Sequence, residues 1–287
     1  MIISTLSHYV NRHYNSNYNC NIRWNQWILI SFTLFISMML LLVPLIVIFV
    51  SAFSEGLKTV IINLTNQDMI HAVFLTVIVA LFTVPINVFF GILMAWLITR
   101  FQFYGRQLLY IFINIPIAVS PVIAGLLYLL FYSNNNIIAN WLDLNNIQII
   151  FTWVGLVLVT IFVTCPFVVH ELVPMMINQG KQEDEAAILL GASGWMMFRY
   201  VTFPNIRWAL LYGAILTNAR AIGEFGAVSI VSGLIRGETY TVSLYVELLY
   251  QDYNTVGAFV AASLLACISI FMLFIKHYLQ SRLKRID

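Results

Sequence analysis

The chain has 287 residues, of which 61% are hydrophobic and 9% charged, and its mean hydropathy is +0.89. Soluble globular domains are about 25% charged, so this composition excludes an ordinary soluble protein. It predicts an all-α polytopic membrane protein. The net charge is +2, and the three cysteines show no metal-ligand spacing. We therefore expect no disulfide framework, no metal or other cofactor and no nucleic-acid partner.

The first two membrane spans are predicted from long apolar runs. Residues 1–27 are polar, rich in Asn, Tyr and His, and lack a signal-peptide core, so we expect a cytoplasmic tail. Residues 28–50 form an uncharged run that is long enough to cross a hydrocarbon core of about 30 Å. After a polar loop, residues 69–98 predict a second span, with a kink at Pro85.

The third and fourth predicted spans contain paired prolines. Residues 108–131 carry Pro116 and Pro121, which indicate a bent or locally unwound helix. Such backbone is tolerated in a membrane only inside protein or beside a wet cavity. Residues 149–176 predict the fourth span, and they also contain two prolines.

Two more spans complete the pattern. Residues 208–233 predict the fifth and residues 256–275 the sixth, and residues 277–287 form a basic tail. Between them, residues 234–255 are expected outside the membrane. Leu244, Leu248 and Leu249 can share one face of a short helix there, which fits surface packing and docking alike. Residues 28–276 thus predict one transmembrane domain with six spans.

The basic residues predict the orientation of these spans. With six spans, one side of the membrane carries eleven of them and the other only Lys58 and Arg236. The eleven are Arg12, Arg23, Arg100, Arg106, Lys181, Arg199, Arg207, Lys276, Arg282, Lys284 and Arg285. Because basic residues accumulate in cytoplasmic loops, both termini are expected in the cytoplasm.

Residues 182–204 form a charged, glycine-punctuated island between apolar segments, which we call the elbow. Acidic residues 183–185 suit the start of a helix, and Gly191 suits its left-handed end. Ser193 is a good N-cap for a second helix, which we expect to run through Val201 and stop before Pro204. By these features alone, the elbow could equally be a solvated connector.

The spacing within the elbow resembles a known motif. Glu185-Ala186-Ala187, Gly191 and Val201-x-Phe203-Pro204 match the E-A-A-x3-G-x9-I-x-L-P loop of type I ABC importer permeases, with Val and Phe replacing Ile and Leu. The resemblance implies the six-helix permease fold and a cytoplasmic coupling loop at about residues 177–207. In that family the loop docks on a cytoplasmic ATPase. The third span is then expected to face the translocation path.

A second motif places two charges inside the fifth predicted span. Arg220 and Glu224 are four residues apart, so they share a helix face, and Gly223 and Gly226 lie beside them. A charge costs about 2.5–3.5 kcal/mol at the centre of a membrane helix, so lipid-facing positions are disfavoured. Two interpretations remain open: a structural ion pair with glycines at close contacts, and a gate or anion path.

The segment R-A-I-G-E-F-G-A, residues 220–227, resembles the oxyanion branch of these importers, and the similarity extends to the W-type permease subunits of bacterial sulfate/thiosulfate importers. It implies a multi-pass protein of the bacterial inner membrane. The implied partners are membrane lipid, a T-type permease in a heterodimer, two cytoplasmic ATP-binding subunits and a periplasmic sulfate/thiosulfate-binding protein. The choice among sulfate, thiosulfate and molybdate stays open, as does a second copy of this chain in place of the T-type permease.

No enzymatic chemistry is expected of the chain itself. It has no nucleotide-binding glycine-rich loop and no nucleophile elbow, and its five histidines lack metal-ligand spacing. A secondary transporter using Arg220, Glu224 and Glu171 for ion coupling is the main rival, and the elbow argues against it. An intramembrane hydrolase would need a nucleophile with a base, or a metal site.

Overall fold

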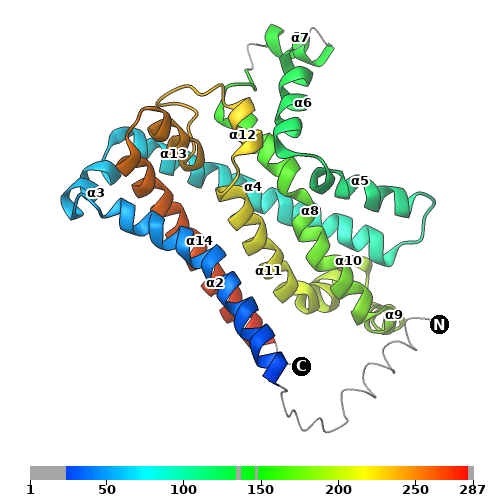
Figure 1. Cartoon of the computed structure of the whole chain (residues 1–287). Helices are drawn as coiled ribbons and strands as arrows, with labels where there is room; N and C mark the ends of the chain where they lie inside the picture. Colours follow the sequence, from blue (N-terminus) through cyan, green and yellow to red (C-terminus); the bar gives the residue numbers. More distant parts are fainter. Residues whose placement is uncertain (1–23, 134–136, 146–147, 284–287) are drawn as a thin grey trace. The chain divides into compact units, whose positions relative to one another are not determined.

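The computed structural model describes residues 24–133, 137–145 and 148–283, and within these ranges the chain is helical with no strand (Figure 1). The helices are α2 (Trp24–Ala52), α3 (Leu57–Leu64), α4 (Gln67–Arg100), α5 (Arg106–Ala118), α6 (Pro121–Ser133), α7 (Ile137–Leu144), α8 (Trp153–Gln179), α9 (Gln182–Leu189), α10 (Gly194–Met197), the π-helix η1 (Phe198–Thr202), α11 (Phe203–Ile222), α12 (Gly226–Val231), α13 (Val242–Gln251) and α14 (Thr255–Leu283). The predicted all-α class is confirmed. Residues 1–23 and 284–287 of the predicted tails lie outside the described residues.

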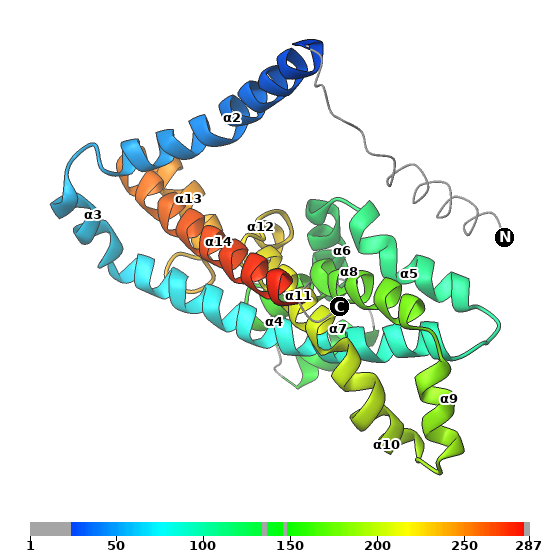
Figure 2. The same cartoon turned by 90° about the horizontal axis from the view of Figure 1, so that it is seen from below.

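The chain divides into two compact units, residues 1–47 and residues 48–287. In the first unit the structure describes the greater part of α2, an apolar helix with Pro44 inside it. The second unit contains the other helices. Its apolar core lies where α4, α8 and α11 pack together, and these three helices lie side by side in both views (Figures 1 and 2).

Small residues let these three helices approach closely. A Cβ atom added to Gly213 of α11 would lie 3.2 Å from the Cα of Val168 in α8, and one added to Gly91 of α4 would meet the Val168 side chain. One turn away, the buried Asn87 donates a hydrogen bond of 2.6 Å to Thr164. This bond pairs the Asn87 amide N–H with a side chain of the neighbouring helix, so it satisfies one buried polar group of the interface.

By length and apolar composition, four described helices can cross a membrane: α2, α4, α8 and α14. The bent pair α5 and α6 adds a fifth if it counts as one span. The remaining predicted span corresponds to α11, which has 20 residues but carries Asn218 and Arg220. These side chains lower its apolar character, and α11 packs against α4, α8 and α14.

The third predicted span is broken, as its prolines indicated. The helices α5 and α6 meet at an angle of 105°, with Val119 extended between them. Pro121 opens α6, where its missing N–H group costs no helical hydrogen bond. It also disfavours helical geometry in the residue before it, so the break falls at residues 119–120.

The fifth predicted span is also broken, which the sequence did not indicate. α11 ends at Ile222 and α12 begins at Gly226, so residues 223–225 interrupt the helix that was expected to run through Gly233. The short α12 packs against α6, while α11 packs against α8, α4 and α14. The break thus separates the segment that packs against α6 from the one that packs against α4 and α14.

The helix predicted within residues 234–255 is α13. Leu244 is fully buried and Leu249 is 7% exposed, while Glu247 accepts a hydrogen bond of 3.2 Å from Gln251 on the polar face. α13 packs against α14 and α4. Its amphipathic pattern is therefore accounted for by packing within the chain.

Candidate functional site

The elbow folds locally much as its sequence predicts. The first helix, α9, ends with Gly191 at a φ of 87°, in the left-handed region. The N–H of Ala192 donates to the carbonyl of Ala187 at 3.0 Å, and that of Gly191 donates to Ile188 at 2.9 Å. These two bonds form a Schellman motif, which satisfies the last carbonyls of α9. Ser193 then caps α10 by accepting from the Met196 N–H at 3.4 Å.

The predicted end of the second elbow helix before Pro204 is wrong. The chain stays helical from α10 through η1 into α11, and Pro204 lies in the first turn of α11. In η1 the hydrogen bonds reach back five residues, as from the Phe203 N–H to the Phe198 carbonyl. Pro204 has no N–H group, and in a regular α-helix its ring would clash with the carbonyl four residues earlier. The wider π turn before it accommodates the ring. The elbow therefore continues directly into the bundle.

A buried ion pair, which the sequence analysis missed, joins the elbow to α4. Arg100 Nε of α4 lies 2.6 Å from Asp184 Oδ2 of α9, and their side chains are 8% and 7% exposed. The Thr202 hydroxyl donates to the other oxygen of Asp184 at 3.1 Å. A carboxylate inside a charged run usually faces water, so only the tertiary structure distinguishes Asp184 from its acidic neighbours.

Further contacts fix the elbow to its surroundings. Glu183 accepts hydrogen bonds from Gln179 at 3.1 Å and from Asn205. The ring of Phe198 lies 5.5 Å from that of Trp96 in α4. The inner side of the elbow is thus packed against the bundle, which leaves its outer side for other contacts.

The outer side of the elbow exposes the motif and a group of large apolar side chains. Glu185 and Ala186 are exposed, and Ala187 is half-buried. Leu189 and Leu190, which follow them, are 88% and 89% exposed. The other apolar side chains exposed on the elbow are Ile188, Trp195, Met196, Tyr200 and Phe203. Such a gathering on a well-anchored element fits contact with a protein partner or with the membrane.

The structure brings Arg220 and Glu224 together at the break in α11. Arg220 Nη2 lies 3.0 Å from Glu224 Oε2, and the two side chains are 37% and 1% exposed. Glu224 Oε1 also accepts the N–H of Ala227 at 3.1 Å. The carboxylate therefore links the end of α11 to the first turn of α12.

The two neighbouring glycines differ in their surroundings. A Cβ on Gly226 would lie 3.1 Å from Val122 Cγ2 and 3.3 Å from Pro121 Cβ, so α12 and α6 are in close contact there. A Cβ on Gly223 would meet only the Ala219 carbonyl oxygen, at an ordinary 3.5 Å. Close packing explains a glycine at position 226 but not at position 223.

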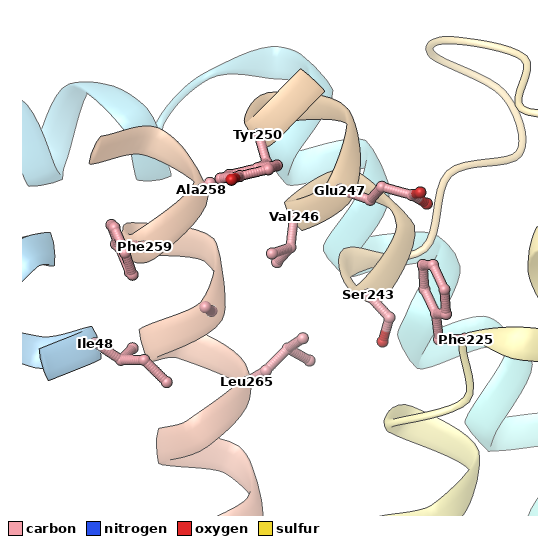
Figure 3. A pocket seen from close by; sticks show the side chains of 10 residues that line it. Ile48, Phe225, Ser243, Val246, Glu247, Tyr250, Ala258, Phe259 and Leu265 are labelled. Atoms are coloured by element: carbon pink, nitrogen blue, oxygen red, sulfur yellow. The ribbon is translucent and has the colours of Figure 1, made fainter. Parts of the chain in front are cut away.

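Two cavities in residues 48–287 differ in the charge of their lining. A groove of about 590 Å³ lies between α13 and α14, and in Figure 3 Val246 and Leu265 point into it. Its charged lining residue is Glu247, which does not favour an anion. A second cavity, of about 800 Å³, lies between α4, α5 and α8 and is lined by Arg106, Gln107 and Asn178 among apolar residues. Of these two cavities, the second offers an anion a positive group.

At the end of the bundle away from the elbow, Arg236 joins three elements. Its guanidinium lies 3.1 Å from Asp68 at the start of α4 and 3.5 Å from Asp252 at the end of α13. The hydrogen bond to Asp68 and the charge of that carboxylate raise the pKa of Arg236 above its ordinary value. All three side chains are partly exposed, so each pair contributes at most about 1 kcal/mol.

Comparison with known families identifies the kind of protein to which these features belong. Residues 87–285 match the family model of the binding-protein-dependent transport system inner membrane component. The matched residues include the elbow and the break after α11. The chain belongs to this family. Its members are multi-pass inner-membrane subunits of importers, and not enzymes.

Curated members of the family align over most of the chain. The sulfate transport system permease protein CysW of Escherichia coli (strain K12) is 65% identical over 263 residues, which covers 92% of this chain and 90% of that protein. The sulfate transport system permease protein CysT of the same strain is 35% identical and covers 77% of this chain and 80% of that protein. This family member is therefore similar to two kinds of sulfate permease, and far more to one of them.

A solved structure supports the fold. A bacterial ABC transporter involved in the import of the acidic polysaccharide alginate contains a chain that superposes with a TM-score of 0.76, at 18% identity, covering 94% of this chain and 98% of that one. Similarity at this level of identity concerns the fold alone. It confirms the type I importer permease fold predicted from the sequence.

Proposed function

We propose that this chain is a membrane-spanning permease subunit of an ATP-driven sulfate importer, and that it also transports thiosulfate. The substrate follows from the similarity to sulfate permeases over nearly the whole chain. The cavity of about 800 Å³, the elbow and the helix break all lie within the aligned family region. The chain provides a path across the inner membrane and hydrolyses nothing itself.

The observation that carries the importer mechanism is the two-sided elbow. Its inner side packs against the bundle and forms the Arg100–Asp184 ion pair, while its outer side exposes Leu189 and Leu190 almost completely. Large apolar side chains held in this way suit a protein partner. We assign the partner as a cytoplasmic ATPase, with Glu185, Ala186, Ala187, Gly191 and Pro204 forming the coupling loop. Closure of the ATPases on ATP then moves the elbow.

The remaining partners follow from the same proposal. A second, T-type permease completes a heterodimer. The sulfate permease CysT, which is 35% identical to this chain, is a permease of that type. Two ATP-binding subunits drive the dimer, and a periplasmic sulfate/thiosulfate-binding protein delivers the anion. With the elbow in the cytoplasm, both termini lie there as well. This orientation agrees with the excess of basic residues on that side.

Two measurements test this proposal. The chain is expressed with its partner subunits in a bacterium whose own W-type permease gene is deleted, and uptake of radiolabelled sulfate and thiosulfate is measured. A tagged chain is then purified to determine whether an ATPase remains bound. Uptake that needs ATP and the binding protein is expected, and uptake that persists without any ATPase would establish a secondary transporter instead.

Paired variants locate the ATPase contact. Replacing Leu189 by Glu puts a charge on the outer side of the elbow and is expected to release the ATPase. Replacing Tyr253 by Glu changes a side chain that is 92% exposed at the other end of the bundle, and it should retain the ATPase. Equal retention by both variants would contradict the assignment of the elbow.

A further inference from the structure

We propose that the Arg100–Asp184 ion pair is the positioning contact through which movement of the elbow reaches α4. This inference rests on the proposed ATP-driven function and adds a residue pair outside the coupling motif. Residues 185–204 carry that motif, whereas Arg100 lies 84 positions before Asp184 in the chain, at the last turn of α4. The helix α4 is a candidate membrane span of 34 residues.

Chain connectivity alone does not link the elbow to α4. The elbow continues into α11 without a break in helical structure, and it joins α8 through Gly180, whose φ is 75°. α4 is remote in the chain, so it is linked to the elbow through its packing against α8 and α11 and through direct side-chain contacts. The direct contacts that the structure describes include the rings of Trp96 and Phe198 and the pair of Arg100 with Asp184.

Arg100 of α4 joins its own helix to two others, α8 and α9. Its Nε contacts Asp184 of α9, and its Nη1 donates to the carbonyl of Gly180 at 2.6 Å and to that of Met176 at 3.3 Å. These carbonyls belong to the end of α8, where a cation is favourable to the helix dipole. In return, Lys181 Nζ donates to the Arg100 carbonyl at 3.2 Å.

Asp184 adds the fourth element. Its second carboxylate oxygen accepts from the Thr202 hydroxyl of η1, which leads into α11. The ends of α4 and α8, together with α9 and η1, are therefore joined around one buried pair. Separating the pair would leave a buried charge without its partner, which is strongly unfavourable. Displacement of the elbow should consequently move α4 together with α8 and α11.

The test compares transport with ATP hydrolysis in the complete importer, reconstituted in vesicles with its binding protein. The single variants are Asp184→Asn, which keeps the size of the side chain, and Arg100→Gln. The double variant combines them, so that two neutral groups face each other. Lys58→Gln is the control, because it removes an exposed charge from α3, outside the coupling loop. Lys58 forms no ion pair that the structure describes.

The ratio of sulfate transported to ATP hydrolysed is the decisive quantity. We expect each single variant to assemble and hydrolyse ATP, but to lower this ratio by about 5-fold or more, which is the lower range of coupling between distant sites. The double variant should recover part of the ratio, because no charge is left unpaired, and Lys58→Gln should keep it unchanged. A role confined to stability would reduce the amount of complex without changing the ratio.

Each other outcome overturns an identifiable statement. If the wild-type complex transports with ATP and the single variants keep its ratio, the inference is wrong while the proposed function stands. If Asp184→Asn, Arg100→Gln and the conservative Asp184→Glu and Arg100→Lys all fail to assemble, the pair is a folding requirement and not a positioning contact. If the wild-type complex shows no ATP-dependent transport, the proposed function itself fails.

Discussion

Glu224 stands between two helices and binds both: its carboxylate lies 3.0 Å from Arg220 in α11 and accepts the N–H of Ala227 in α12. The side chain is 1% exposed, whereas that of Arg220 is 37% exposed. The pair therefore has a buried end with a structural task and an accessible cationic end. The buried Glu224 fits the interpretation as a structural ion pair, and the accessible Arg220 fits the interpretation as a gate or anion path. The two interpretations predict different behaviour for the same variants.

Replacing Arg220 by Leu leaves the Glu224 carboxylate buried without its cation, which should cost up to about 3 kcal/mol and lower the amount of folded protein. If the pair is structural, adding Glu224→Gln should largely restore both assembly and sulfate uptake, because Gln can still accept from Ala227. Adding Glu224→Leu should restore less, since it leaves that N–H unpaired. Subunit level and radiolabelled uptake are measured together for the single variant and both double variants.

If Arg220 instead serves the anion path, the deciding case is the double variant that combines Arg220→Leu with Glu224→Gln. This variant has no unpaired buried charge, so it should assemble normally, but it should transport poorly because the accessible cation is gone. If assembly and uptake are unaltered in every variant, both interpretations are wrong.

The elbow turn depends on Gly191, whose φ of 87° strains any β-branched residue. Gly191→Val should cost about 1 kcal/mol or more and displace the outer side of the elbow, so that uptake falls while the protein still inserts. A Cβ at this position has open space, so backbone strain is the sole cause. Gly194→Val, which also adds atoms in open space but at a negative φ, should transport well. Normal uptake by Gly191→Val at wild-type expression would argue against the coupling role.

The contact between α6 and α12 depends on Gly125. A Cβ there would lie 2.6 Å from the Ala227 carbonyl oxygen, a backbone atom that can move only with α12. Gly125→Ala should therefore lower the free energy of unfolding by about 1–3 kcal/mol. Gly223→Ala adds the same methyl group at an ordinary contact distance and should have little effect. The thermal midpoints of the two purified variants compare them directly, and equal midpoints would disprove the close contact.

Two tyrosines near the end of the bundle away from the elbow predict sensitivity to alkaline pH. Burial, followed by the charge of Asp68, raises the pKa of Tyr245 above its ordinary 10.0, and burial also raises the pKa of Tyr240. Since the unfolded chain loses these protons first, the stabilisation is complete below pH 10.0 and is lost as pH rises through the folded pKa values. Tyr245→Phe should reduce the fall in thermal midpoint above that pH, and the exposed Tyr253→Phe should not. An unchanged fall in Tyr245→Phe would contradict this.

The sequence alone determined the fold class, the apolar spans and the elbow turn. These features depend on interactions between residues close in the chain: long apolar runs, a glycine at the left-handed end of α9, and Ser193 as a cap. The prolines at positions 116 and 121 likewise determined the break between α5 and α6, because a proline constrains its immediate neighbours.

Tertiary structure decided what the same residue types do in different places. Asp184 is buried against Arg100 while Glu185, the next residue, is exposed, and both belong to one acidic run. The interruption of the fifth span after Ile222 and the continuation of the helix through Pro204 were also decided by packing. Asp184 and α12 contact helices that are remote in the chain, α4 and α6 respectively. Pro204 follows a π turn, whose wider hydrogen bonds leave no mark in the local sequence pattern. Contacts of this kind depend on which helices meet, and the sequence of one helix does not specify its neighbour.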